Sequence, residues 1–447
     1  MSEAALNAAR VFMGDSLGFH IIFVSFGLTL PILVSWLEWT GIIKNRPDLV
    51  NLAKFWSKIM ALLVVAGVIS GTIIALQMTL VWPGILKFGG EVIGLPFMFE
   101  TYAFLIEAVF LALYMATWNN KKVKPKIHAV FGLFVILGST LSAYAITSIN
   151  GWMNLPTGFE VVNGQLVNIS VADAMFSRTA IVQFVHSMPA YYFAVTLTIA
   201  GIYAFKVLRT KKKDRFKKDH NLDWYIIKRL MYFACALLVV LIITADISAK
   251  YLAKYEPVKL AAIEVVKETT TNAPYLVGGF VTADGRILAP YAEVPGLLSL
   301  LAGNSFDTKV IGLNEYPINE RPPLYVHNIF VVKLFLVGVA STIVIAFVAI
   351  SRFFKKKLNS SVLLFSVGIS GLIAFTLVEL GWMITEIGRQ PWAVRGFLKT
   401  SEAVTKTHDI TSFGYLFPLA YVLLFVVTIL EVIKIVQYEN RKKGTNK

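Results

Sequence analysis

The stretch of residues 381–392, Gly-Trp-Met-Ile-Thr-Glu-Ile-Gly-Arg-Gln-Pro-Trp, carries the side chains best placed to do chemistry. It closes a strongly apolar run, which brings the Glu386 carboxylate and the Arg389 guanidinium to the rim of a predicted membrane-spanning helix. Charges in that position are costly and are usually functional. The plainer interpretation is that Glu386 and Arg389 pair with each other, while Trp382 and Trp392 mark the membrane surface.

Two histidines are candidates for a metal or haem iron. His20 lies early in the first apolar run, and His186 lies early in the fifth. A lone histidine on an apolar helix is usually a core residue with its hydrogen bonds satisfied, and this alternative stays open for each one taken singly. Ligation becomes the better interpretation only if several such side chains meet.

Two carboxylates lie within the third apolar run. Glu100 and Glu107 are seven residues apart, which places them two turns along one face of a helix. A stripe of two intramembrane carboxylates is typical of a proton relay. The alternative is that each is neutral and hydrogen-bonded to Ser or Thr side chains of neighbouring helices.

A long polar segment, 251–326, separates the helical segments 1–250 and 327–447. It is too long for a turn and carries seven prolines among charged residues, so it is predicted to be a functional loop. Within it, Lys259 and Glu264 are five residues apart and share no helical face, which argues against a simple ion pair. The two could bind a headgroup and accept its protons, or could be an exposed, solvated pair.

Composition places the chain in a membrane. Hydrophobic residues make up 56% of its 447 residues and charged residues only 15%. Most of the surplus basic charge lies between apolar runs, so the net charge of +15 reflects membrane topology rather than nucleic-acid binding. The single cysteine, Cys235, excludes an intramolecular disulfide and c-type haem attachment. No basic lead precedes the first apolar run, so no cleavable signal peptide is expected.

Nine apolar runs are long enough to cross a bilayer: 16–39, 57–80, 96–118, 127–149, 181–206, 225–250, 327–350, 361–385 and 412–436. Lys and Arg gather in alternate connections, which the positive-inside rule assigns to the cytoplasm: 44–54, 121–126, 209–218, 352–357 and 441–447. The N-terminus is therefore predicted to lie outside and the C-terminus in the cytoplasm. The remaining connections face outward: 81–95, 150–180, 251–326 and 386–411.

This topology brings four candidate ligands to one side of the membrane. His20, His186, Lys333 and Glu386 all fall near the predicted outer surface, each on a different helix. Helix bundles that bind haem build their axial sites from facing helices in this way. The fold class predicted is therefore an all-α integral membrane protein with a haem-binding bundle of nine transmembrane helices.

Taken together, these motifs resemble subunit I of cytochrome bd-type quinol oxidases over nearly the whole length. The most specific of them is the stretch 381–392, which is intact here. Several others occur in the family's order: the spacing from Arg10 to His20, Gly-Ser-Thr-Leu-Ser-Ala at 138–143, Asn-Gly-Trp-Met at 150–153, Phe-Val-His at 184–186 and Lys-Leu-Ala-Ala-Ile-Glu at 259–264.

The resemblance implies three haems near the outer face: a low-spin haem b, a high-spin haem b, and a haem d that reduces oxygen. His186 would ligate the low-spin haem b, while His20 and Glu386 would each serve one of the two high-spin haems. Arg389 would neutralise propionate or carboxylate charge beside them, and Trp392 would pack at the haem edges. Which ligand serves which macrocycle, and whether the oxygen site holds haem d or a further haem b, stay open.

The resemblance also implies the reaction, in which quinol is oxidised at the outer face and oxygen is reduced to water with cytoplasmic protons. Lys259 and Glu264 match the residues that bind the quinol headgroup. Glu100 and Glu107 match the carboxylates that supply protons, although relatives space the pair one residue wider, which displaces Glu100 rather than Glu107. A second, related membrane subunit is the expected partner, and the cell membrane is the expected location.

One position departs from the family. Relatives supply a methionine to the low-spin haem a few residues after a Pro-Pro-x-x-Val-His segment; that segment is present at 322–327, but Lys333 occupies the methionine position. The hypothesis is ligation by His186 and Lys333. Alternatives are His327, Met383, a five-coordinate haem, or pairing of Lys333 with a propionate. A nitrogen ligand in place of methionine should lower the haem potential, because methionine raises it.

Two other functions would fit a membrane protein of this size. A non-catalytic haem-binding paralogue would support an active partner without reducing oxygen, although its sequence should have lost the ligands or the quinol loop. A proton-coupled transporter would favour broken helices and repeats at mid-membrane, and neither pattern is found.

Overall fold

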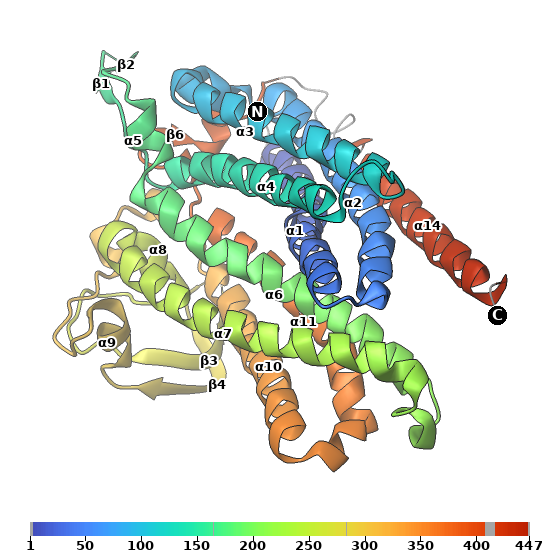
Figure 1. Cartoon of the computed structure of the whole chain (residues 1–447). Coiled ribbons are helices and arrows are strands. Elements are labelled where there is room, and N and C mark those ends of the chain that lie inside the picture. The colour runs from blue at the N-terminus through green and yellow to red at the C-terminus, as the bar shows by residue number, and fades with distance from the viewer. Residues whose placement is uncertain (1–2, 164, 283, 407–415, 446–447) are drawn as a thin grey trace. The chain divides into compact units, whose positions relative to one another are not determined.

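The computed structural model describes residues 3–163, 165–282, 284–406 and 416–445 (Figure 1). Within these ranges, nine helices are long and apolar enough to span a membrane, which confirms the predicted helical membrane fold. The first residues of the run expected at 412–436 lie outside the described residues. Lys447, in the last basic segment, also lies outside them. The inside and outside assignments, and the three segments 1–250, 251–326 and 327–447, stay predictions.

The chain forms two compact units. The first comprises Met1–Trp152, Thr157–Ala180 and Ser401–Lys447, as far as these are described. Most of its structure is helical, with one small hairpin: α1 (Glu3–Ile43), α2 (Pro47–Leu80), α3 (Pro83–Thr117), α4 (Pro125–Asn154), β1 (Glu160–Val162), β2 (Gln165–Val167), α5 (Val171–Met175), α12 (Thr400–Ala403) and α14 (Leu416–Thr445).

The second unit comprises Met153–Pro156 and Ile181–Thr400. Four long helices form its membrane part: α6 (Arg178–Leu208), α7 (Asn221–Tyr255), α10 (Tyr325–Phe353) and α11 (Ser361–Ile387). Shorter elements connect them: η1 (Lys212–Asp214), η2 (Lys218–His220), α8 (Pro257–Ile263), β3 (Tyr275–Val281), β4 (Ile287–Val294), α9 (Leu297–Gly303), η3 (Leu313–Glu315), η4 (Ile318–Glu320), η5 (Lys355–Asn359), β5 (Trp392–Val394) and β6 (Leu398–Lys399).

The helices begin where local chemistry favours it. Pro47 and Pro83 occupy the first turns of α2 and α3, where a missing backbone donor costs nothing. Ser360 caps α11 by accepting a hydrogen bond from the Leu363 amide. Several helices are longer than the apolar runs, because hydropathy marks the part that fits in lipid and not the helix ends.

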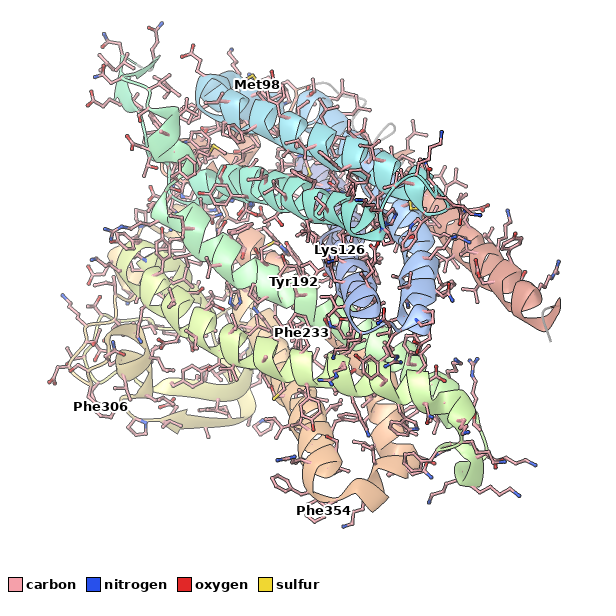
Figure 2. The ribbon with its side chains drawn as sticks, in the orientation of Figure 1. Met98, Lys126, Tyr192, Phe233, Phe306 and Phe354 are labelled. Carbon is pink, nitrogen blue, oxygen red and sulfur yellow. The ribbon has the colours of Figure 1, made fainter. Side chains whose placement is uncertain are left out.

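Glycines let neighbouring helices approach closely. A Cβ at Gly201 of α6 would lie 2.7 Å from the Gly368 carbonyl oxygen of α11. In the other unit, a Cβ at Gly138 of α4 would lie 2.6 Å from the Glu107 amide nitrogen of α3. Small residues at contacts are typical of membrane helices, whose association depends on close packing. Large apolar side chains such as Phe233 and Met98 are instead exposed, as a lipid-facing surface requires (Figure 2).

The segment 251–326 is an ordered layer in the second unit. Its α8 buries Ala261, Ala262 and Ile263 against Val326 of α10 and Ile384 of α11. The antiparallel hairpin β3–β4 joins α10 through Asn328, whose side chain bonds both the amide and the carbonyl of Val281, at 2.7 and 3.0 Å. The loop is therefore fixed to the ends of the helices that carry candidate ligands.

Candidate functional site

His20 is held by a hydroxyl group whose own hydrogen is already used. Its Nδ1 lies 2.8 Å from Ser70 Oγ, and that hydroxyl donates to the Gly67 carbonyl. Ser70 must therefore accept from Nδ1–H, which leaves Nε2 with a bare lone pair. The ring packs closely against α2, since a Cβ at Gly71 would be 3.2 Å from His20 Cε1. This tautomer is the one that ligates a metal through Nε2.

His186 has the same arrangement in the other unit. Its Nδ1 lies 3.0 Å from Thr244 Oγ1, which donates to the Leu241 carbonyl. The imidazole therefore donates through Nδ1 and leaves Nε2 free of a proton. Among the described residues Nε2 has no hydrogen-bond partner, so it is available to a ligand.

Lys333 lies near His186. The Lys333 charge acts on the His186 imidazole, which places the two side chains within electrostatic range on α10 and α6. Its Nζ rests against α11, 3.3 Å from where a Cβ at Gly381 would be. No described residue pairs with this amine by a hydrogen bond or an ion pair. The two residues that the sequence proposed as a ligand pair therefore lie within electrostatic range of each other, and their ligation of one iron stays a prediction.

Glu386 and Arg389 form an ion pair at the end of α11, as the plainer interpretation of the stretch expected. The pairing does not bury the carboxylate, because the Glu386 side chain is 24% exposed. Arg389 also donates through Nη1 to the Ala393 carbonyl at 2.8 Å, whereas its buried Nε has no partner among the described residues. Trp392 lies in β5 with Lys399 Nζ 5.6 Å from a ring centroid.

Glu100 and Glu107 lie on α3 and differ in burial. Glu107 is 6% exposed, and its backbone packs closely on Gly138 of α4, whereas Glu100 is half-buried. Within the described part of the chain, neither carboxyl group has a hydrogen-bond partner. The alternative that Ser or Thr side chains satisfy them is therefore not what the structure shows.

Lys259 is buried in an ion cluster, with 3% of its side chain exposed. Its Nζ lies 2.5 Å from Glu256 Oε2 and donates to Asn154 Oδ1 at 2.6 Å. The stem packs on the end of α11, because a Cβ at Gly388 would lie 2.9 Å from Lys259 Cγ. Burial lowers the pKa of the Lys259 ammonium, and the Glu256 carboxylate opposes that effect.

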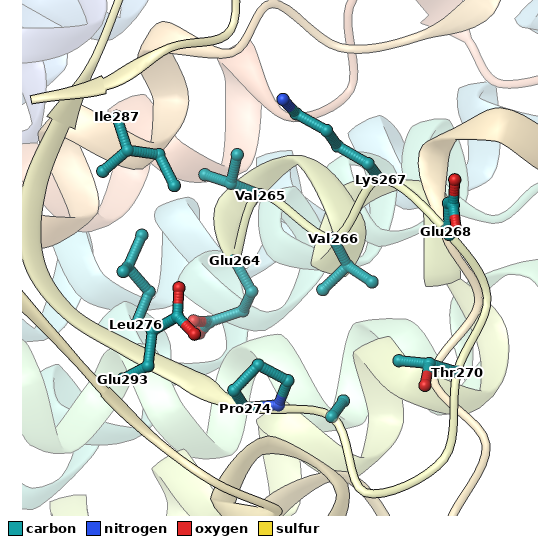
Figure 3. Close-up of a pocket in the computed structure, with 11 residues that line it drawn as sticks. Glu264, Val265, Val266, Lys267, Glu268, Thr270, Pro274, Leu276, Ile287 and Glu293 are labelled. Carbon is teal, nitrogen blue, oxygen red and sulfur yellow. The ribbon is translucent and has the colours of Figure 1, made fainter.

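Glu264 is also buried, but it is not part of the ion cluster around Lys259. With Val266, Pro274 and Glu293 it lines a cavity of about 190 Å³, in which Lys267 extends away from Glu264 (Figure 3). Burial raises the pKa of the Glu264 carboxyl to about 8, and its Oε2 has no partner among the described residues. Since both Lys259 and Glu264 are buried, the alternative of an exposed, solvated pair is wrong.

His327 was the first alternative ligand to Lys333. Its Nδ1 donates to the Ile263 carbonyl at 2.6 Å and it is fully buried. Its Nε2 is buried and has no partner among the described residues. The bond to Ile263 anchors the end of α8, and His327 stays an alternative axial ligand. Met383 is 44% exposed on α11.

The sequence did not single out several residues of these clusters. Glu256, Asn154 and Arg395 surround Lys259. Only the three-residue spacing of Glu256 and Lys259 could have indicated the pair. Glu379 lies two turns before Glu386 on α11, outside the motif 381–392, and its buried Oε1 has no partner among the described residues.

Comparison with known proteins gives the family. The profile of the cytochrome bd terminal oxidase subunit I family matches residues 8–440. This chain belongs to that family. The resemblance and the enzyme class predicted from the sequence, a cytochrome bd-type quinol oxidase, are confirmed.

Relatives match the chain along nearly its whole length. A Bacillus subtilis (strain 168) protein, provisionally named a cytochrome bd menaquinol oxidase subunit I, is 33% identical over 94% of each chain. The cytochrome bd ubiquinol oxidase subunit 1 of the same strain is 28% identical over 98% of this chain and 96% of the relative. A solved bd oxidase structure from Geobacillus thermodenitrificans matches with a TM-score of 0.90 at 32% identity, covering 97% of this chain and 98% of that chain.

Membership of the cytochrome bd family implies haem, and the donor set fits it. His20 and His186 each present an unprotonated Nε2 held by a second hydrogen bond, which is how histidine ligates iron. Lys333 offers an amine with no described partner, and Glu386 offers a partly exposed carboxylate. No group of three or more His, Cys, Asp or Glu side chains that could hold a metal ion is found among the described residues.

Proposed function

We propose that this subunit oxidises quinol in the loop 251–326, at the outer face of the cell membrane, and reduces oxygen to water with protons from the cytoplasm. The observation that carries the proposal is the contact between the loop and the end of α11. Lys259 of the loop packs on Gly388, two residues from the candidate ligand Glu386. A headgroup bound beside Lys259 would lie close to the end of α11, and its two electrons are proposed to pass to the low-spin haem and from there to the high-spin haems.

The residues proposed to hold the haems follow from their free ligand atoms. His186 with Lys333 would hold a low-spin haem b, and His20 and Glu386 would each hold one of two high-spin haems, of b and d type or both of b type. Arg389 and Trp392 would lie beside the macrocycles. When bound, the haems would transfer electrons and bind oxygen.

The loop residues have properties suited to quinol oxidation. Glu264 is proposed to accept a proton from the headgroup, because a carboxyl with a pKa of about 8 is close to the operating pH of a general base. Lys259 is proposed to bind an oxygen of the headgroup with the N–H that its two described partners leave unused. Protons released here would leave on the outer side.

Protons for oxygen reduction are proposed to pass Glu107 and then Glu100 on α3. Of the two carboxylates, Glu107 has the stronger structural support for this role, because it is buried where α3 packs on α4. Uptake from the cytoplasm and release outside would move charge across the membrane without a separate pump. The active unit is proposed to contain a second, related membrane subunit, as the family implies.

The test is Glu386→Ala in the purified complex, measured by the absorption of the high-spin haems and by oxygen consumption with quinol. We expect loss of one high-spin haem and of oxygen reduction, because the carboxylate ligand is gone. The matched control is Glu431→Ala, which removes an exposed carboxylate paired with Lys434 on the surface, and should leave both unchanged. Retained haem and full oxygen consumption in Glu386→Ala would refute its role. A wild-type complex that holds haem but consumes no oxygen would indicate the non-catalytic paralogue instead.

A further inference from the structure

The Lys259 ammonium is held from two sides. Glu256, at the start of α8, places Oε2 2.5 Å from Nζ, and Asn154, from the end of α4, accepts a hydrogen bond at 2.6 Å. Both charged side chains are at least 97% buried, with 2% of Glu256 and 3% of Lys259 exposed. The contact with Asn154 is a hydrogen bond, whereas the contact with Glu256 is an ion pair whose Oε2 has no hydrogen-bond partner among the described residues. Since an ammonium has three N–H donors, at least one of them is left for a ligand.

Arg395 completes the cluster from the turn that follows the stretch 381–392. Its Nη2 lies 3.4 Å from the same Glu256 Oε2, and its backbone amide donates to the Met153 carbonyl at 3.1 Å. The buried Nε of Arg395 has no partner among the described residues. Glu256 therefore lies between two cations that come from different parts of the second unit.

The charges around Lys259 are not balanced without Glu256. The charged groups that act on Lys259 are Glu256, Arg395 and Arg389, and only the first attracts it. Tyr251 and Tyr316 face Arg395 and interact with its charge. Burial and the two guanidinium groups lower the pKa of Lys259, whereas Glu256 raises it. Loss of Glu256 would leave a buried ammonium facing two guanidinium groups.

We propose that Glu256 and Arg395 are positioning residues of the quinol site, which together keep the Lys259 ammonium charged and aim its third N–H at an oxygen of the quinol headgroup. Glu256 fixes the direction of the Nζ, and Arg395 fixes Glu256 through the second contact with Oε2. This inference rests on the proposed binding of quinol at Lys259 and adds two residues that act through it.

The experiment is a double-mutant cycle on the complete oxidase complex, with duroquinol as the substrate. Glu256→Gln removes the charge and keeps the shape, and Arg395→Gln removes the charge of its partner and leaves a shorter polar side chain. We expect Glu256→Gln to raise KM about tenfold with kcat changed less than about twofold, because it disturbs a hydrogen bond made by a charged donor. The double variant should raise KM by less than the product of the two single effects, because the residues are in contact.

Three further variants make the outcome decisive. Asp307→Asn alters an exposed carboxylate of the same segment and should leave KM unchanged. Glu256→Asp keeps the charge and should give a KM between wild type and Glu256→Gln; it replaces the latter in the cycle if that variant is not recovered folded. Lys259→Met reports on the proposed function itself. The absorption of the low-spin haem confirms the fold of each variant.

The failures are distinguishable. If Lys259→Met leaves KM unchanged, quinol does not bind at Lys259 and the proposed quinol site fails. If Lys259→Met raises KM but Glu256→Gln does not, or if the two single effects multiply without coupling, the site stands and the positioning role of Glu256 and Arg395 is overturned.

Discussion

Two buried charge networks in this chain differ in how completely their polar atoms are satisfied. In the first unit, Glu38 accepts from Tyr114 Oη at 2.7 Å and pairs with His128 Nδ1 at 2.6 Å, while His128 Nε2 lies 2.9 Å from the Tyr114 carbonyl. In the second unit, the cluster around Glu256 leaves the Nε atoms of Arg389 and Arg395 without described partners.

The difference separates a structural network from a binding site. A carbonyl only accepts, so His128 Nε2 carries a hydrogen and one proton is shared between Nδ1 and Glu38. Every polar atom of that network has a partner, and it joins α1, α3 and α4. The second cluster is buried yet incomplete, which is costly unless something else supplies the missing partners. The open network is therefore where a ligand is expected.

The largest expected effect concerns the closed network. His128→Leu would leave the buried Glu38 carboxyl without the partner that shares its proton, and breaking a buried ion pair costs about 3–5 kcal/mol. We expect a markedly lower midpoint of thermal unfolding in detergent. Arg395→Leu in the open cluster should lower it much less, because Lys259 stays 2.5 Å from Glu256. Equal losses in the two variants would contradict the distinction.

Lys333 resembles the cluster around Glu256 in having a polar group without a partner, since no described residue pairs with its amine. If it ligates the low-spin haem, Lys333→Met should change that haem's absorption spectrum and raise its midpoint potential, because methionine ligation raises the potential. Lys250→Met, which removes a lysine paired with Asp246 on α7, serves as the control. An unchanged spectrum and potential in Lys333→Met would exclude Lys333 as a ligand.

The role proposed for Glu264 can be tested by the pH dependence of quinol oxidation. Its pKa is raised to about 8, and only the ionised form accepts a proton, so the active fraction falls about tenfold per pH unit below 8. We expect kcat/KM for duroquinol to rise with pH and to level off near 8. Glu264→Gln should lower the plateau and abolish this dependence. A rising limb that persists in Glu264→Gln would assign the ionisation to another group.

Much of the fold could be predicted from hydropathy, because a bilayer requires long apolar helices wherever the chain crosses it. The helix ends could not. The first apolar run was placed at 16–39, whereas α1 extends over Glu3–Ile43, since polar turns continue a helix beyond the lipid. The elements of the loop 251–326 were also missed, because short hairpins such as β3–β4 depend on tertiary contacts like those of Asn328.

Residues of the candidate site that belong to a sequence motif could be predicted. Residues that join the site only through tertiary contacts could not. The stretch 381–392 indicated Glu386 and Arg389 directly, and their pairing is seen. Burial of Lys259 was not predictable, because it depends on Asn154, which is 105 residues away in sequence. Glu38 and His128 are 90 residues apart and match no spacing pattern, so only the folded chain brings them together.

The smallest expected effect sharpens the comparison within the closed network. Tyr114→Phe removes one hydrogen bond to the Glu38 carboxyl and leaves the contact with His128 in place. The matched control is Tyr421→Phe, which removes a buried bond at 2.7 Å to a neutral acceptor, the Ser70 carbonyl. A bond to a charged group contributes about 1.5–3 kcal/mol and a neutral one about 1 kcal/mol. If Glu38 is ionised, Tyr114→Phe should lower the thermal midpoint more than Tyr421→Phe does; equal shifts would mean that the shared proton resides on Glu38.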